Sequence, residues 1–112
     1  MSDTQMLDAA FSALAHPVRR AMLARLIEAD ATVNELAKPF DMSLPAISKH
    51  IRVLETAGLI TRGKHAQFRP CQINASGLEQ VANWTDQYRH IWEARFDKMT
   101  DLIVAKEGKT HD

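Results

Sequence analysis

The stretch from Ser43 to Ile60 constrains the fold more than any other part of this 112-residue chain. Ser43 is a residue type that caps helices, and Pro45 follows in the first turn, where its missing N–H costs no hydrogen bond. Gly58 is the expected end of the helix. The apolar residues at helical spacing between these ends are Ile47, Ile51 and Leu54. The pattern predicts a helix with one buried face and one polar face.

A second, shorter helix is predicted directly upstream, over residues 32–40, with Asp41 and Met42 as the turn. The small Ala37 would let the two helices cross closely. Asp41 occupies the turn position that usually needs a positive φ, which Asp tolerates better than most residues. The pair indicates a helix-turn-helix, whose second helix fits the DNA major groove. The alternative is a core fragment with a solvated polar face, but the caps, the turn and the polar face agree with DNA binding.

Positive charge is concentrated on this region, although the chain as a whole is neutral. Residues 43–72 carry five Lys and Arg against one Glu, whereas residues 1–42 and 73–112 each carry two more acidic than basic residues. This distribution is the electrostatic footprint that phosphate binding needs.

Three further elements are predicted around the helix pair. Residues 4–14 and 17–29 read as helices, the second with Val18, Met22, Leu23, Leu26 and Ile27 facing inward. Residues 59–63 and 67–73 read as two strands, giving a basic hairpin over 59–73 that resembles the wing of a winged helix. Such a wing contacts the DNA backbone or minor groove. The alternative is a hairpin that only closes the core.

A long helix is predicted over residues 76–105, beginning with a capping box at Ser76 and Glu79. It would span roughly 45 Å, which is too long for a core of this size to cover. The simplest partner for its surplus apolar stripe is a second copy of the chain. The alternative is two helices, broken near Thr85 and folded back. The expected fold is therefore mainly α with a small β-hairpin (α+β): one winged helix-turn-helix domain over residues 1–112.

Composition indicates the cellular location of the protein. No apolar run approaches the ~18 residues of a membrane span, and the first residues lack a secretory pattern. The lone Cys71 rules out an intrachain disulfide and is typical of a reducing cytoplasm. We therefore expect a cytoplasmic protein without a membrane partner.

The motifs Ala13–Arg20 and Ser43–Ile60 resemble the arsenical-resistance-repressor (ArsR) family of winged helix-turn-helix regulators, and the likeness covers residues 7–73 well. The resemblance implies a homodimeric repressor that binds double-stranded DNA at an inverted repeat, with its first and last helices forming the dimer interface. The DNA contacts would then be Ser43, Pro45, Ala46, Ser48, Lys49, His50 and Arg52 from the helix, and Arg62, Lys64, His65, Gln67 and Arg69 from the wing. The dimer contacts would be Met6, Leu7, Ala10, Phe11, Trp84, Tyr88, Ile91, Trp92, Phe96, Met99, Leu102 and Ile103.

The chain departs from the metal-sensing members of that family. Residues 33–38 hold no Cys, and a soft-metal site needs two or three thiolates. Asp86, His90 and Glu93 share one helical face, which would allow weak zinc binding. An ion-pair ladder on the surface is the favoured interpretation. We expect no metal and no cofactor. Cys71 is interpreted as a buried core residue rather than a redox reporter. Trp84, Tyr88 and Trp92 are interpreted as packing residues of the dimer seam, with a binding site for an unknown small-molecule effector as the alternative.

Two function classes compete with a DNA-binding repressor. The first is a winged-helix module that binds protein instead of DNA, which the exposed aromatic stripe would allow. The second is an enzyme, which the sequence disfavours, because no nucleophile–base pair, paired carboxylates or phosphate-cradling Gly loop stands at useful spacing.

Overall fold

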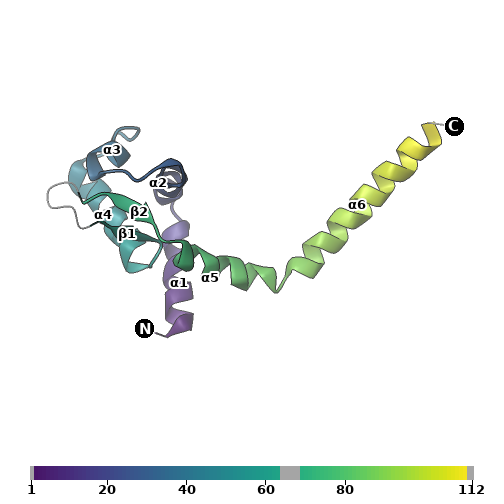
Figure 1. Ribbon diagram of the computed structural model, residues 1–112, viewed down its shortest axis with the longest axis horizontal. Coiled ribbons are helices and arrows are strands. Elements are labelled where there is room, and N and C mark those ends of the chain that lie inside the picture. Colours follow the sequence, from purple (N-terminus) through teal and green to yellow (C-terminus); the bar gives the residue numbers. More distant parts are fainter. Residues whose placement is uncertain (1, 64–68, 111–112) are drawn as a thin grey trace. The chain divides into compact units, whose positions relative to one another are not determined.

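The computed structural model describes residues 2–63 and 69–110, with side chains up to residue 104. The elements in chain order are α1 (Asp3–Leu14), α2 (Pro17–Glu28), α3 (Val33–Ala37), α4 (Leu44–Thr56), β1 (Ile60–Arg62), β2 (Cys71–Ile73), α5 (Ala75–Asp86) and α6 (Arg89–Thr110) (Figure 1). The chain divides into two compact units, Met1–Val81 and Ala82–Asp112, with the boundary inside α5.

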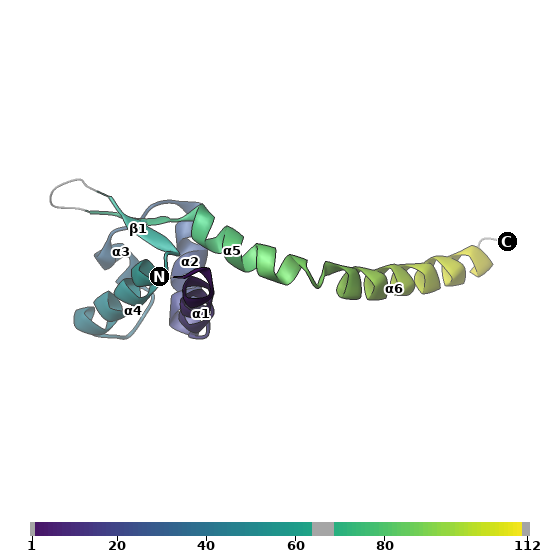
Figure 2. The same ribbon diagram turned by 90° about the horizontal axis from the view of Figure 1, so that it is seen from below.

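The core of the first unit lies among α1, α2, α3 and α4, and the hairpin lies along one side of these helices (Figure 2). Every element from α1 to β2 contributes a fully buried or nearly fully buried side chain to it. The largest fully buried side chains are Met22, Leu36, Ile47, Ile51, Leu54, Leu59, Ile60 and Cys71. The mainly α fold with a small hairpin, expected from the sequence, is confirmed.

Side-chain caps fix where the first four helices begin. Ser2 and Thr32 each form a capping box, with Gln5 and Glu35 three residues on. His16 caps α2 by accepting a hydrogen bond at Nδ1 from the backbone N–H of Val18. The Ser43 hydroxyl caps α4, as predicted.

Two local expectations for this unit were wrong. Ile27 is 76% exposed rather than inward-facing, because its side chain leaves the helix about 100° round from that of Leu26, which is only 4% exposed and packs in the core. No non-glycine residue in the described part of the chain has a positive φ, so Asp41 does not adopt the left-handed conformation. α3 ends at Ala37, and three further residues make the turn less tight than the sequence pattern suggested.

The hairpin pairs β1 with β2 in antiparallel register, with Ile60 opposite Ile73 and Arg62 opposite Cys71. Ala31, between α2 and α3, extends the pairing through two backbone hydrogen bonds with Cys71, at 2.7 and 3.1 Å. The paired segments are shorter than the predicted strands. Residues 64–68, at the predicted tip of the wing, lie outside the described residues.

The start of α5 is held against the turn that follows α4. Gly58 closes α4 with a φ of 77°, as predicted for a helix-ending glycine. The side-chain amide of Asn74 donates a 2.8 Å hydrogen bond to the Gly58 carbonyl. α5 begins at Ala75, so Ser76 lies inside the helix and the predicted capping box at Ser76 is wrong; the Ser76 hydroxyl bonds Asn74 Oδ1 instead.

The single helix predicted over 76–105 is also wrong, because it is interrupted between α5 and α6. Side chains compete for the backbone carbonyls at this point. The Thr85 hydroxyl donates to the Ala82 carbonyl at 2.9 Å, and the Gln87 amide donates to the Trp84 carbonyl at 2.9 Å. The backbone N–H of Tyr88 then bonds the Thr85 carbonyl, which tightens the turn. The alternative of a break near Thr85 was correct on this point. Among the described residues, no helix combines the length and the apolarity that crossing a membrane requires.

Candidate nucleic-acid interface

The two faces of α4 divide as the sequence predicted. Ile47, Ile51 and Leu54 are at most 1% exposed and face the core. Lys49 and Arg52 are exposed on the other side of the helix. Of the remaining predicted DNA contacts on this segment, Ser43 and Pro45 are exposed, and Ala46, Ser48 and His50 are half-buried. α4 therefore presents two solvent-exposed cations on one face, while its other face is packed in the core.

Arg19 ties this helix to α1 and α2, a link that the sequence analysis missed. Its Nε and Nη2 donate hydrogen bonds to the carbonyls of Ala13 and Ser12, at 2.7 and 3.1 Å. Its Nη1 lies 3.1 Å from Nδ1 of His50. A guanidinium only donates, so His50 Nδ1 is the acceptor and the ring is neutral in this arrangement. One side chain thereby connects the end of α1 to the middle of α4.

The His50 ring lies among positive and titratable groups. It packs on the ring of His16, with centroids 4.4 Å apart and an interplanar angle of 51°. Burial, followed by the charges of His16, Arg19 and Lys49, lowers the pKa of His50 below its usual value of 6.5. The predicted role of His50 in DNA contact is untested, but its Nδ1 is already occupied by Arg19.

We expect acidification to destabilise the protein through His50. Because its pKa is lower in the folded state, the unfolded chain binds the proton more readily, and stability present above about pH 6.5 is lost as the pH falls toward the folded pKa. Replacing His50 with Gln keeps a hydrogen-bond acceptor for Arg19 but removes the titration. Urea unfolding at pH 7.5 and 5.5 should show a smaller loss for His50→Gln than for the unsubstituted protein. An equal loss in both proteins would assign the pH effect to other groups.

The hairpin places two of the predicted wing residues. The Arg62 Nε donates a 3.1 Å hydrogen bond to the Arg69 carbonyl, across the two arms of the hairpin. The Arg69 side chain itself is exposed. Lys64, His65 and Gln67 lie outside the described residues. The base of the wing is thus held by Arg62, and Arg69 presents a cation to solvent.

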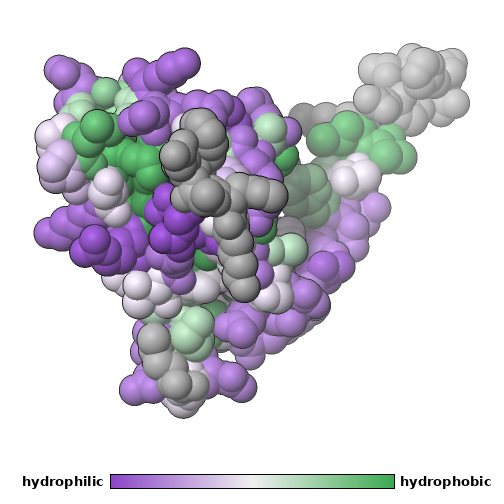
Figure 3. Space-filling model, turned by 60° about the vertical axis from the view of Figure 1, so that its left-hand side comes forward, coloured by the Kyte–Doolittle hydropathy of each residue, from purple (hydrophilic) through white to green (hydrophobic). Residues whose placement is uncertain are grey.

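Figure 3 shows the face of the molecule on the side of the hairpin and α3. It is covered mostly by hydrophilic side chains, interrupted by an apolar patch in its upper part. A hydrophilic face suits a charged polymer such as DNA.

The predicted dimer residues fall in both units. In α1, Ala10 is only 2% exposed and belongs to the core of its own chain, whereas Phe11 is partly exposed and Met6 and Leu7 are half-buried. In α5, in α6 and in the turn between them, the predicted residues are all exposed: Trp84, Tyr88, Ile91, Trp92, Phe96, Met99, Leu102 and Ile103. The Trp84 and Tyr88 rings pack together at 5.1 Å. Ala10 is therefore a core residue rather than a surface one.

The described residues contain no group of three His, Cys, Asp or Glu side chains arranged to hold a metal ion. Asp86 and Glu93 instead both pair with Arg89, the latter at 3.7 Å. This is the ion-pair ladder that the sequence favoured. Cys71 is completely buried, and burial raises the pKa of its thiol, which disfavours the reactive thiolate. The interpretation of Cys71 as a core residue is confirmed.

Comparison with known proteins identifies the family. A family model for a helix-turn-helix domain matches residues 14–62. The HTH-type transcriptional regulator Rv2034 of Mycobacterium tuberculosis is 35% identical over 110 residues, covering 98% of this chain and 100% of that protein. The crystal structure of the ArsR family transcriptional regulator RHA00566 is 44% identical, with a TM-score of 0.73 over 80% of this chain and 93% of that one. The chain belongs to the ArsR family of winged helix-turn-helix transcriptional regulators.

A further relative of this ArsR-family chain is the transcriptional repressor SdpR of Bacillus subtilis, 34% identical over 74 residues that cover 66% of this chain and 82% of that protein. Because the family consists of transcriptional regulators, the expected class of DNA-binding regulator rather than enzyme is confirmed. The region that the family model matches, residues 14–62, contains both α3 and α4.

Proposed function

We propose that this ArsR-family protein is a metal-independent homodimeric repressor that reads an inverted-repeat operator. The observation that carries the proposal is the division of α4, with Ile47, Ile51 and Leu54 fixed in the core and Lys49 and Arg52 in solvent. A helix so anchored can enter the major groove without losing its own packing, and its cations can reach phosphates and base edges.

The wing adds phosphate contacts beside this helix. Arg69 is exposed and Arg62 holds the two arms of the hairpin together, so the hairpin presents its charge from a defined position. Ser43, Pro45, Ala46 and Ser48, at the start of α4, would lie nearest the bases, because recognition helices contact base edges with their N-terminal residues. Lys64, His65 and Gln67 keep their proposed role in the wing.

Homodimer formation is supported by the apolar side chains of α6. The exposed side chains of Trp92, Phe96, Met99 and Ile103 follow one another at three- or four-residue spacing along one face. A stripe of this length in water favours association with an apolar partner, and a second copy supplies an identical stripe. A dimer would also present two copies of α4, as an inverted repeat requires.

Independence from metal is proposed because the acidic side chains that could serve as ligands already have partners. Asp86 and Glu93 share Arg89, which would have to be displaced before a cation could bind. Repression rather than activation is proposed by analogy with the relative named as a transcriptional repressor, SdpR.

Fluorescence anisotropy on the DNA upstream of the protein's own reading frame tests the proposal. If two subunits together neutralise about four phosphates, affinity should fall about 100-fold between 50 and 200 mM salt. Adding zinc or a chelator should leave the affinity unchanged, and sedimentation should show a dimer on the DNA. Salt-insensitive or absent binding to duplex DNA, including genomic fragments beyond this region, would overturn the proposal and favour a protein-binding module.

A further inference from the structure

A cavity of about 650 Å³ lies between α2 and α3, away from the cations of α4. Its volume is in the range of about 300–1,000 Å³ that is common for small-molecule sites. It lies wholly within the first unit, and its lining comes from two helices and from the residues directly after α3. Neither the DNA-binding surface nor the proposed dimer surface uses these side chains.

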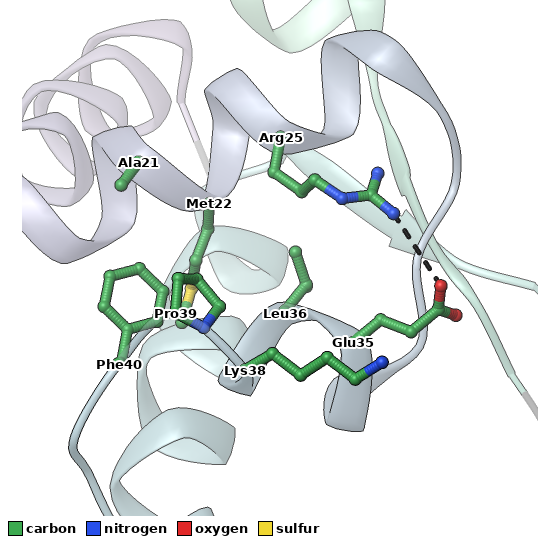
Figure 4. A pocket seen from close by; sticks show the side chains of 8 residues that line it. All are labelled: Ala21, Met22, Arg25, Glu35, Leu36, Lys38, Pro39 and Phe40. Atoms are coloured by element: carbon green, nitrogen blue, oxygen red, sulfur yellow. Dashed lines mark ion pairs between the residues drawn. The ribbon is translucent and has the colours of Figure 1, made fainter.

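The lining is polarised along its length (Figure 4). Phe40, Pro39 and Met22 gather at one end and form an apolar pocket. Arg25, Glu35 and the ammonium of Lys38 lie at the other end, with Leu36 between the two regions. A ligand that matches this arrangement has an apolar body and a single polar head.

The charges at the polar end favour an anionic head. Two cations face one carboxylate there, which leaves one positive charge in excess. Glu35 is held in place by the backbone N–H and hydroxyl of Thr32, both at 3.1 Å from its Oε1. The ion pair between Glu35 and Arg25 is long, at 3.7 Å, and partly solvated. It therefore contributes little to stability, and Arg25 can exchange Glu35 for another anion. The ammonium of Lys38 has no hydrogen bond or ion pair with any residue that the structure describes.

We propose that this cavity binds a small carboxylate with an aromatic or branched aliphatic body, and that the bound ligand acts as an effector. The carboxylate pairs with Lys38 and with Nη2 of Arg25, which exchanges Glu35 for the ligand while Nη1 keeps its 3.0 Å hydrogen bond to the Ala29 carbonyl. The body of the ligand packs on Phe40, Pro39 and Met22. A monoanion balances the excess charge, and the apolar end provides the burial that a compact ligand needs.

The cavity is placed to influence DNA binding. α3 packs directly on α4, and the residues from Lys38 to Phe40 lead into the turn before Ser43. Met22 and Leu36 line the cavity and are also fully buried core side chains. A ligand bound between α2 and α3 would therefore contact α3, and a shift of α3 would change the position of α4. This step rests on the proposed DNA-binding function, whereas ligand binding itself does not.

The first test is NMR titration of the full-length ¹⁵N-labelled protein with 3-phenylpropionate, using the neutral alcohol 3-phenylpropan-1-ol for comparison. The carboxylate should give saturable shifts in residues 21–25 and 35–40, and the alcohol should bind about tenfold more weakly because it gains no ion pair. The paired substitution Arg25→Gln and Lys38→Gln should remove the difference between the two compounds.

Matched substitutions on α2 locate the site. Ala21 lines the cavity from an exposed helix position, so Ala21→Phe fills it without disturbing the core. Ala24→Phe adds the same ring at an exposed position of α2 that does not line the cavity. Ala21→Phe should abolish the shifts and Ala24→Phe should preserve them. Even a low binding energy per non-hydrogen atom would give a ligand of this size a dissociation constant below about 10 mM. Absence of binding up to that concentration of carboxylate therefore overturns the proposal, as does binding that survives Ala21→Phe.

The effector role has a separate readout. Saturating 3-phenylpropionate should change the affinity for operator DNA about fivefold or more in the unsubstituted protein, and not in Ala21→Phe. Saturable binding without any change in DNA affinity would refute the effector role while leaving the binding site. Failure of DNA binding in the absence of ligand would instead refute the proposed function, so the two failures are distinguishable.

Discussion

Replacing Gly77 with Ala is expected to destabilise the protein by about 3 kcal/mol, although alanine normally stabilises a helix relative to glycine. A Cβ at position 77 would lie 1.9 Å from the Gly58 carbonyl oxygen and 2.8 Å from the carbonyl carbon. Both atoms belong to backbone, so no flexible side chain can move aside. Urea unfolding followed by circular dichroism gives the free energy directly.

The turn at Gly58, which lies against Gly77, cannot easily move away. Gly58 has a φ of 77°, which other residues adopt only with strain, and its carbonyl is held by the Asn74 amide at 2.8 Å. A Cβ at Gly58 would itself meet the Met6 side chain at 3.1 Å. The substitution must therefore displace α5 from the end of α4, or distort the turn that ends α4.

Gln80→Ala is the matched control, because it places alanine at an exposed position of the same helix, one turn further on. This variant should be neutral or slightly stabilised, as helix propensity predicts. A Gly77→Ala protein as stable as the Gln80→Ala protein would show that α5 and the Gly58 turn do not touch in solution.

The local rules of helix formation made α4 predictable from sequence. Its cap at Ser43, its buried stripe and its end at Gly58 each depend on residues within a few positions of one another. The fold class followed from these signals and from the change of period into the hairpin. The exposed positions of Lys49 and Arg52 followed from the same helical spacing.

The features that sequence reasoning missed depend on contacts between distant residues or on weak local competition. Arg19 and His50 are 31 positions apart, and no spacing rule joins them. The cavity between α2 and α3 exists only once the two helices pack. The break after Asp86 is a local event, but it results from side-chain hydrogen bonds of Thr85 and Gln87 that an apolar stripe does not reveal.

Removing Lys49 and Arg52 together should weaken operator binding about 100-fold or more at moderate salt. Both cations are exposed on the face of α4 opposite its buried stripe, and neither has a hydrogen bond or ion pair within the described residues. A dimer loses four cations in the double variant Lys49→Ala, Arg52→Ala. Because neither side chain supports the core, thermal unfolding and the sedimentation of the dimer should remain unchanged.

The salt dependence distinguishes loss of phosphate contact from loss of base reading. Each lost phosphate contact should reduce the slope of log affinity against log salt by about one. The exchange Lys49→Arg with Arg52→Lys keeps the charge but changes the geometry of the donors. It should preserve the slope and weaken operator binding more than binding to unrelated DNA, since bidentate contacts with guanine need a guanidinium in a fixed place.

Lys98→Ala controls for the loss of charge itself, because Lys98 is an exposed cation of α6. It should affect operator affinity far less than Lys49→Ala alone. If the double variant bound the operator as tightly as the unsubstituted protein, with the same salt slope, α4 could not be the reading helix. The net positive charge of residues 43–72 would then have to act through the wing, where Arg69 is the exposed cation that the structure describes.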